Sequence, residues 1–238
     1  MFEMLYPTFK FNKEITVLET FAGIGSQRKA LDRLAIKYNL KIDYLPPVEF
    51  DKYAIASYNA IHGTIHETKD ITKTKGTEYG QIDLFTYSFP CQDISLAGNQ
   101  KGFSRESKTR SGLLWEVERI LKEMKHLPKV LLMENVKNLV SEKFIDDFQE
   151  WQRELENLGY KNYYKILNAK DYGIPQNRER VFMVSILGEY NYNFPQPIPL
   201  ELRLKDMLED EVNEKYYLSD RMLNTFSDMT DRNGFVRG

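Results

Sequence analysis

The single cysteine of the chain, Cys91, lies in the stretch "DLFTYSFPCQDIS". An apolar run precedes it and a polar stretch follows, so the thiol is expected at the exposed end of a strand. A thiolate is a strong nucleophile, although only about 3% of an ordinary thiol is ionised at pH 7. A lone intracellular cysteine is more often a small buried apolar residue, so this pattern alone leaves both roles open.

Glu134 follows four consecutive apolar residues in "VLLMENV". A carboxyl group that emerges from a buried strand can lose its hydration, keep a proton at neutral pH and act as a general acid. Arg178 and Arg180, in "QNRER", supply positive charge that could favour the thiolate of Cys91. The simpler alternatives are that Glu134 caps a helix or forms a structural salt bridge with one of these arginines.

A glycine-containing turn, "ETFAGIGSQRKA", joins an apolar run to a helical pattern. Gly23 and Gly25 would let the backbone approach a ligand closely, but Arg28 stands where the dinucleotide fingerprint has a third glycine. Glu49 follows the next apolar run and could accept hydrogen bonds from ribose hydroxyls, or be an ordinary exposed acid. Asp70, in "TKDIT", could reach an adenine, although by itself it is typical of a turn.

The elements that must position these residues alternate between apolar strands and amphipathic helices. This alternation predicts an α/β fold with a mostly parallel sheet covered by helices on both faces. In such a sheet, ligands bind outside the carboxyl ends of the strands, where the candidate residues gather. Strands are predicted at 15–20, 44–50 (where the prolines confine the regular part to the last residues), 81–88, 129–136, 162–169 and 180–187. Helices are predicted at 27–38, 52–63, 112–127 (closed by Pro128) and 144–159.

Composition limits the remaining possibilities. The chain of 238 residues is 42% hydrophobic and 13% aromatic, which is ample for a packed core. It contains no apolar run of about 18 residues and no secretory signal pattern, so no membrane partner is expected. One cysteine and three histidines form no internal disulfide and make a poor metal site. A reducing, cytoplasmic location is therefore the default expectation.

Charge is unevenly distributed, although the net charge is only −2. Residues 98–112 carry four basic residues and one acidic residue, whereas 200–238 carry six basic and nine acidic residues. The chain therefore lacks a strongly basic DNA-binding face but has one short basic loop, which could equally be a solvated surface turn.

Eight stretches, in this order along the chain, resemble the motifs of the C5-cytosine DNA methyltransferases. The resemblance runs from about residue 15 to 187 and continues more weakly through "LKDMLE" and "YYLSDRML". It implies the Rossmann-like, doubly wound sheet of S-adenosyl-methionine-dependent methyltransferases. The matching stretches are "FAGIGS" (21–26), "VEFDKYA" (48–54), "KDIT" (69–72), "SFPCQDIS" (88–95), "GNQKGF" (98–103), "SGLLWE" (111–116), "ENVKNL" (134–139) and "LNAKDYGIPQNRERVF" (167–182).

The resemblance assigns a chemical role to each candidate. Cys91 would add to C6 of cytosine and make C5 nucleophilic, while Glu134 would protonate or hydrogen-bond N3. Arg178 and Arg180 would bind the base oxygen and the neighbouring backbone. On the substrate side it also places Gln92, Ser95, Lys101, Asn135 and Gln176, with Asn135 helping to fix its loop.

The methyl donor implied by the resemblance is S-adenosyl-methionine, and no metal is required. Glu49 matches the ribose ligand, Phe50 an aromatic residue beside the adenine, and Asp70 and Ile71 the segment that meets the adenine edge. The expected cofactor-binding residues are Phe21, Gly23, Ile24, Gly25, Glu49, Phe50, Asp70, Ile71 and Pro90. Ser26 departs from the family, which often has glycine there.

The implied partner is double-stranded DNA, from which the cytosine must be flipped out of the stack. The basic loop 98–112 could then close over the flipped nucleotide. We find no target-recognition region or final two motifs after residue 187, so the expected organisation is a catalytic domain at 1–190 followed by a linker and an incomplete recognition region at 191–238. A second polypeptide or a further C-terminal region would then be needed for specificity.

Other functions are compatible with the same framework. One is a non-catalytic regulatory or assembly module, although the joint presence of Cys91, Glu134, Arg178 and Arg180 argues against it. Another is cytosine-5 methylation of RNA, which these residues do not distinguish from DNA methylation. A nicotinamide oxidoreductase is a distant alternative, because Arg28 breaks that fingerprint and nothing would account for Cys91.

Overall fold

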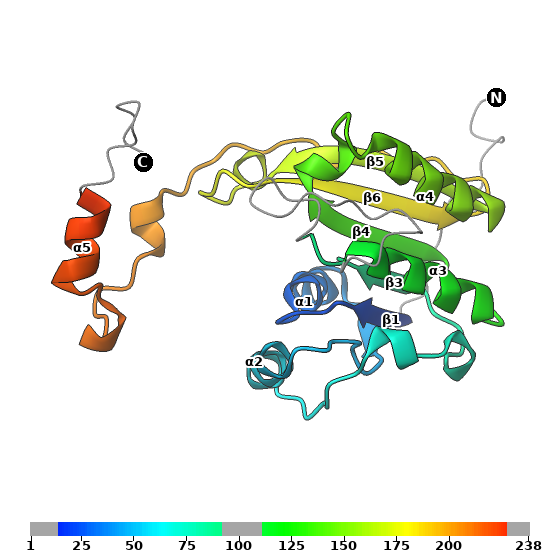
Figure 1. Cartoon of the computed structure of the whole chain (residues 1–238), viewed down its shortest axis with the longest axis horizontal. Helices are drawn as coiled ribbons and strands as arrows, with labels where there is room; N and C mark the ends of the chain where they lie inside the picture. The colour runs from blue at the N-terminus through cyan, green and yellow to red at the C-terminus, as the bar shows by residue number, and fades with distance from the viewer. Residues whose placement is uncertain (1–13, 92–110, 228–238) are drawn as a thin grey trace.

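A computed structural model describes residues 14–91 and 111–227 of the chain. Its six strands form one sheet in the order β2-β1-β3-β4-β6-β5 (Figure 1). The first four strands in this order are parallel, whereas β6 runs antiparallel to both β4 and β5. The mostly parallel α/β sheet is thereby confirmed. The strands are β1 (Glu14–Thr20), β2 (Lys41–Tyr44), β3 (Leu84–Tyr87), β4 (Val130–Val136), β5 (Tyr160–Asn168) and β6 (Glu179–Leu187).

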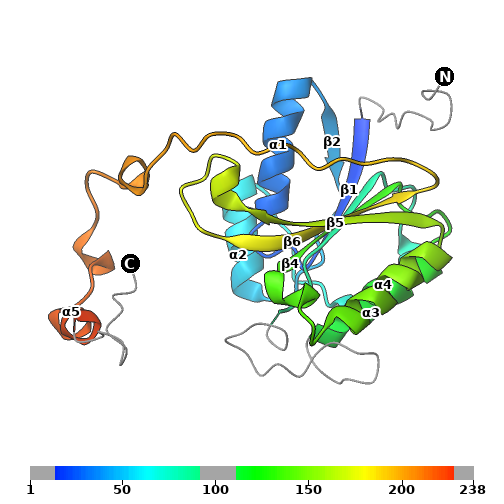
Figure 2. The ribbon, with the colours of Figure 1, turned by 90° about the horizontal axis from the view of Figure 1, so that it is seen from above.

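Helices cover both faces of the sheet, as predicted. Helices α3 and α4 lie on one face, and α1 and α2 lie on the other (Figures 1 and 2). None of the helices in the described parts of the chain is long and apolar enough to cross a membrane. The helices are α1 (Ser26–Tyr38), α2 (Lys52–His62), α3 (Leu114–Glu123), α4 (Ile145–Asn157) and α5 (Asp220–Ser227).

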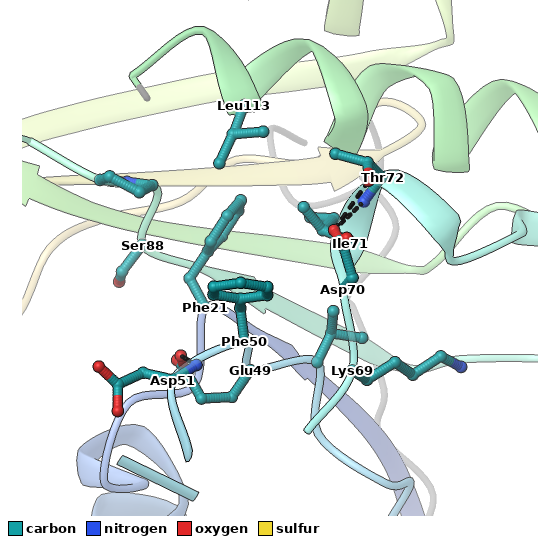
Figure 3. A pocket seen from close by; sticks show the side chains of 12 residues that line it. Phe21, Glu49, Phe50, Asp51, Lys69, Asp70, Ile71, Thr72, Ser88 and Leu113 are labelled. Atoms are coloured by element: carbon teal, nitrogen blue, oxygen red, sulfur yellow. Dashed lines mark hydrogen bonds between the residues drawn. The ribbon is translucent and has the colours of Figure 1, made fainter. Parts of the chain in front are cut away.

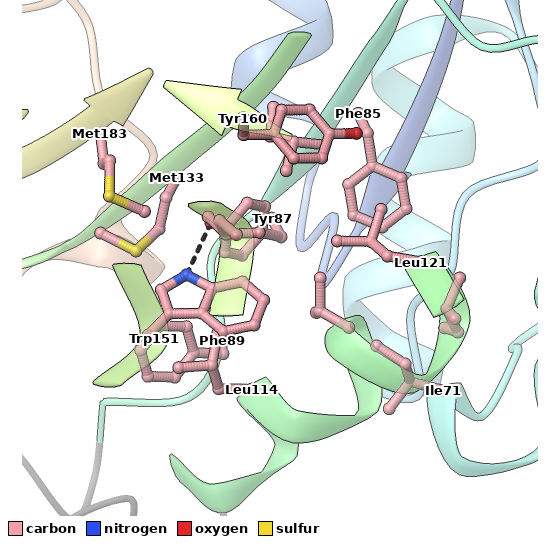
Figure 4. Packing of buried hydrophobic residues seen from close by; sticks show 14 of the residues in the cluster. Ile71, Phe85, Tyr87, Phe89, Leu114, Leu121, Met133, Trp151, Tyr160 and Met183 are labelled. Atoms are coloured by element: carbon pink, nitrogen blue, oxygen red, sulfur yellow. Dashed lines mark hydrogen bonds between the residues drawn. The ribbon is translucent and has the colours of Figure 1, made fainter. Parts of the chain in front are cut away.

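The larger part of the core lies between the sheet and helices α3 and α4. Phe148, Trp151 and Leu155 recur along α4 at helical spacing and are all fully buried. Trp151 packs edge-on against Tyr87 of β3 and donates its indole N–H to the tyrosine hydroxyl at 3.0 Å (Figure 4). This bond satisfies both buried polar groups, so the aromatic pair locks α4 onto the strand that leads to Cys91.

The opposite face of the sheet is covered more thinly. Leu31 of α1 packs there against a cluster that includes Val17 and Leu84. The rest of the cover comes from the segment after β6, because Tyr190, Tyr192 and Phe194 pack on the same cluster. The segment expected as a linker after residue 190 therefore begins by lying against the sheet. Residues 201–224 are exposed throughout, and α5 lies away from the sheet in both views (Figures 1 and 2).

Two predicted elements differ most from the structure. The second strand was predicted at 44–50 but is β2, Lys41–Tyr44, because Pro46 and Pro47 have no N–H to donate to a sheet. The N–H groups of Leu45 and Val48 still bond to β1, at 2.9 and 2.8 Å, so this segment follows the sheet without forming a strand. Helix α3 ends at Glu123 rather than beside Pro128, because Met124 adopts an extended conformation and caps the helix.

Candidate active site

The turn after β1 is held in an unusual backbone conformation. Phe21, Gly23 and Gly25 have φ angles of 54°, 56° and 79°, and such angles are rare for a residue with a side chain. The Phe21 N–H donates to the Val48 carbonyl at 2.8 Å, and the Gly23 N–H donates to the Glu49 carboxylate at 2.8 Å. Residues 48–49 therefore fix the shape of this turn.

Glu49 is already immobilised by the backbone. One carboxylate oxygen accepts the Gly23 N–H and the other accepts the Asp51 N–H, both at 2.8 Å. Each oxygen retains lone-pair capacity for a further donor. The side chain can therefore accept hydrogen bonds from two neighbouring hydroxyls without first choosing a conformation.

A hollow of about 650 Å³ lies at the carboxyl ends of β1 and β3, where the sheet changes direction of winding and ligands of such folds bind. Figure 3 shows Phe21, Phe50 and Ile71 around it, with Ser88 across from Ile71 and Thr72. We call this cavity the first hollow. Six of the predicted cofactor residues line it: Phe21, Glu49, Phe50, Asp70, Ile71 and Pro90. The other six lining residues were not predicted as site residues: Val48, Asp51, Lys69, Thr72, Ser88 and Leu113.

Asp70 shapes the wall of the first hollow. Its carboxylate accepts hydrogen bonds from the Thr72 N–H at 3.0 Å and the Thr72 hydroxyl at 2.8 Å. These two bonds hold the pKa of Asp70 below its usual range. Asp70 thus stays ionised at neutral pH and caps the short helical turn Ile71–Lys73.

Arg119 of α3 connects this wall of the first hollow to helix α3 through hydrogen bonds. One terminal nitrogen of its guanidinium donates to the carbonyls of Ile71 and Thr74, at 3.0 and 2.9 Å. The remaining donors bind Glu116 and Glu123, each at 2.8 Å. Because a guanidinium has its donors in a fixed fork, lysine could not reproduce this set of contacts.

We expect Arg119→Met to weaken binding of a nucleoside cofactor by roughly tenfold, since two carbonyls of the pocket wall lose a charged donor. Calorimetric titration with the cofactor measures this loss. Lys122→Met is the matched control, because Lys122 lies on the same helix but pairs with Glu118 and Glu154 instead. Equal affinities for the two variants would contradict a role for Arg119 in positioning the wall.

A buried polar cluster supports the turn from behind. Glu19, only 2% exposed, accepts the Tyr58 hydroxyl at 2.7 Å and the Arg28 N–H at 3.0 Å. Burial raises the pKa of Glu19, and the bonds from Tyr58 and Arg28 oppose that rise. Gly25 supplies no side-chain cap to α1, so Glu19 satisfies one of the helix's N-terminal donors. This cluster was not predictable from local sequence patterns, because its members are distant along the chain.

A second hollow, of about 550 Å³, lies between α1 and the sheet. The predicted cofactor residues Gly23 and Ile24 line it, as do Glu134 and Arg178. Much of the remaining wall is apolar, with Ala30, Leu31, Leu34, Leu132 and Phe182. The predicted residue Gly25 lines neither hollow. It packs instead against His62 and Tyr58, which any Cβ at this position would meet within 2.8 Å.

The cysteine lies in a third, smaller hollow of about 180 Å³. Cys91 is half-buried there, and the hollow also contains Glu134, Asn135, Arg178 and Arg180. The Arg180 Nε lies 3.1 Å from a Glu134 carboxylate oxygen, and both side chains are about a quarter exposed, at 23% and 24%. The salt bridge that was considered as the simpler alternative for Glu134 is therefore present, and it lies beside the cysteine.

The other predicted substrate residues have different surroundings. Asn135 is buried, donates to the Phe89 carbonyl at 3.1 Å and accepts the Val136 N–H at 2.8 Å. It thus holds the backbone just before Cys91. Gln176 is exposed and lines none of these three hollows. Gln92, Ser95, Lys101 and most of the basic loop 98–112 lie outside the described residues.

Together, the fold and these adjoining hollows define an α/β protein with a nucleoside-sized cavity beside an accessible cysteine. The chain belongs to the C-5 cytosine-specific DNA methylase family, which matches residues 15–237. It is 38% identical to the type II methyltransferase M2.ScrFI of Lactococcus lactis subsp. cremoris, over 88% of this chain and 72% of that protein. It is 36% identical to the orphan methyltransferase M.SssI of Spiroplasma monobiae, over 87% of this chain and 68% of that protein.

Solved structures share the fold. The Dnmt2 methyltransferase of S. pombe superposes with a TM-score of 0.70 at 24% identity, over 90% of this chain and 66% of that one. The methyltransferase EhMeth of Entamoeba histolytica gives 0.72 at 22% identity, over 89% and 65%. The chain thus spans about two thirds of the length of these structures. At these identities the similarity shows the doubly wound methyltransferase fold alone.

Proposed function

We propose that this chain is the catalytic part of a DNA (cytosine-5)-methyltransferase that uses S-adenosyl-methionine and forms a covalent bond between Cys91 and C6 of a flipped cytosine. The observation that carries the proposal is the adjacency of the first hollow to the hollow of Cys91. A donor nucleoside and an acceptor base could occupy them at the same time. Family membership supports DNA as the substrate.

The first hollow fits an adenosine-containing donor. Its walls offer a fixed carboxylate in Glu49 for ribose hydroxyls, and aromatic and aliphatic faces in Phe21, Phe50 and Ile71 for a purine ring. A Cβ added at Gly23 would meet nothing within 4 Å, so the turn leaves open space for a ligand. S-adenosyl-methionine, when bound, supplies an electrophilic methyl group attached to sulfur.

The residues around Cys91 suit the acceptor chemistry. The thiolate forms a bond to C6, and the electron pair of the C5–C6 double bond makes C5 nucleophilic. Glu134 hydrogen-bonds or protonates N3, which absorbs charge that the addition pushes into the ring. Arg180, paired with Glu134, fixes the direction of that carboxyl group and offers its remaining donors to the base. After methylation, loss of the C5 proton and elimination of the thiolate release 5-methylcytosine.

The second hollow supports the need for a further segment. Helix α1 has no fully buried residue, and Leu34 beside this hollow is 44% exposed. The Thr86 hydroxyl is buried there and has no hydrogen-bond partner in residues 14–91 and 111–227. An apolar segment with one polar group could cover the exposed side of α1 and also hydrogen-bond the Thr86 hydroxyl. We propose that it comes from a second polypeptide, or from a further C-terminal region, that also reads the DNA sequence.

Transfer of a tritiated methyl group to mixed-sequence duplex DNA tests the function, with and without a candidate second polypeptide. We expect feeble transfer by the chain alone, because a chain of net charge −2 has little affinity for phosphate, and strong transfer with the partner. Full sequence-specific activity of the chain alone would contradict the need for a partner. Failure to form an adduct with 5-fluorocytosine DNA, even with the partner, would contradict covalent catalysis and favour a non-catalytic role.

A further inference from the structure

Ser88 lies where the three hollows meet. Among the described residues it is the only one that lines all three. The first hollow and the hollow of Cys91 share just two residues of the described chain, Ser88 and Pro90. Proline has no polar side-chain group, so among the described residues Ser88 contributes the only polar side chain at the boundary between these two cavities.

The orientation of this hydroxyl is fixed by another residue. The Gln27 side chain, in the first turn of α1, donates its amide N–H to the Ser88 oxygen at 3.0 Å. This bond uses one lone pair of the hydroxyl oxygen and leaves the second lone pair and the O–H available. Gln27 therefore connects the helix that follows the glycine turn to the strand end that carries Cys91.

We propose that Ser88 contacts the methyl donor at its sulfonium centre, with Gln27 as the residue that positions it. This inference rests on the proposed function. If the nucleoside occupies the first hollow and the base lies against Cys91, the methyl group must cross the boundary between the two cavities. Ser88 and Pro90 form that boundary.

The chemistry of the two groups is complementary. A sulfonium centre carries a positive charge, which polarises the C–H bonds of its attached carbons. A hydroxyl oxygen with a free lone pair can accept weak hydrogen bonds from those carbons. The by-product of methyl transfer is a neutral thioether, so the same oxygen gains much less from it. Ser88 would thus favour the charged donor over its neutral product.

Calorimetric titration without DNA tests this discrimination. S-adenosyl-methionine and S-adenosyl-homocysteine are each titrated into the full chain and its Ser88→Ala variant. We expect Ser88→Ala to weaken binding of the charged donor by roughly three- to tenfold and of the neutral product by less than about twofold. Gln27→Ala should act in the same direction but less strongly, and it keeps the test decisive if Ser88→Ala fails to fold.

Ser141→Ala is the matched control, because the Ser141 hydroxyl has no hydrogen-bond partner within the described part of the chain and lines none of the three hollows. Its affinities for both ligands should equal those of the unchanged chain. Equal weakening of both ligands by Ser88→Ala, or no weakening of either, would overturn the assignment of Ser88 while leaving the proposed function intact. If the unchanged chain binds neither ligand, the proposed function fails, and this inference fails with it.

Discussion

Replacing Cys91 with serine is expected to reduce methyl transfer by roughly 10³-fold or more, because a serine hydroxyl is almost un-ionised at neutral pH and is a much weaker nucleophile than a thiolate. Serine has nearly the same size, so the hollow around residue 91 should keep its shape. The measurement is single-turnover transfer of a labelled methyl group to duplex DNA under the conditions that give the unchanged protein its highest rate.

Cofactor affinity separates this chemical role from a structural one. Cys91 lines only the third hollow, so the dissociation constant of S-adenosyl-methionine should change by less than about twofold in the serine variant. The variant should also form no covalent adduct with 5-fluorocytosine DNA. A large loss of cofactor binding, or retention of the adduct, would show that the role of the cysteine is misassigned.

Gly25→Ala is expected to produce the largest loss of stability, about 2–4 kcal/mol of the free energy of unfolding, by combining backbone strain with overpacking. The glycine has a φ of 79°, and an added Cβ would lie 2.3 Å from His62 Nε2 and 2.8 Å from Tyr58 Cδ2. The His62 side chain is only 2% exposed, so it has little room to move away. Denaturant unfolding gives the stability, and titration should show at least a tenfold loss of cofactor affinity, because the turn forms part of the proposed cofactor site.

Gly23→Ala is the matched control for the stability effect. Gly23 has a similar φ of 56°, but a Cβ there would meet nothing within 4 Å. It should therefore cost about 1 kcal/mol, the backbone strain alone. Adding His62→Ala to Gly25→Ala should restore part of the lost stability, because it removes the closest contact. Equal losses for the two glycine variants would show that crowding at Gly25 is unimportant.

Much of the fold was predictable, because the buried strands are rich in apolar residues and helices α3 and α4 each bury a clear apolar stripe. The prediction of helix 144–159 agreed closely with α4, since Phe148, Trp151 and Leu155 all point into one core. The prediction of the second strand was wrong because Pro46 and Pro47 interrupt the pairing. A pattern of apolar residues indicates which segments are buried, but it does not show whether enough backbone N–H groups are available to pair as a strand.

A residue of the candidate site was predictable only where the short segment around it already indicates its chemical role. Three such residues each follow an apolar run: Cys91, Glu49 and Glu134. In the structure they lie toward the carboxyl ends of the parallel strands. The supporting residues were missed, because their function depends on contacts between distant segments. Gln27 meets Ser88 across 61 positions, and Arg119 meets Ile71 across 48. No local pattern distinguishes such residues from ordinary surface glutamine or arginine.

Because the carboxylate of Glu49 is fixed before any ligand binds, mutations near it should affect ligand affinity and protein stability differently. When a flexible acidic side chain becomes ordered on binding a ligand, the lost conformational entropy normally weakens the affinity. Here the N–H groups of Gly23 and Asp51 already order the Glu49 side chain in the folded protein, so ligand binding does not have to order it. A substitution that loosens only the Glu49 side chain should therefore weaken ligand capture while the melting temperature of the empty protein stays almost unchanged.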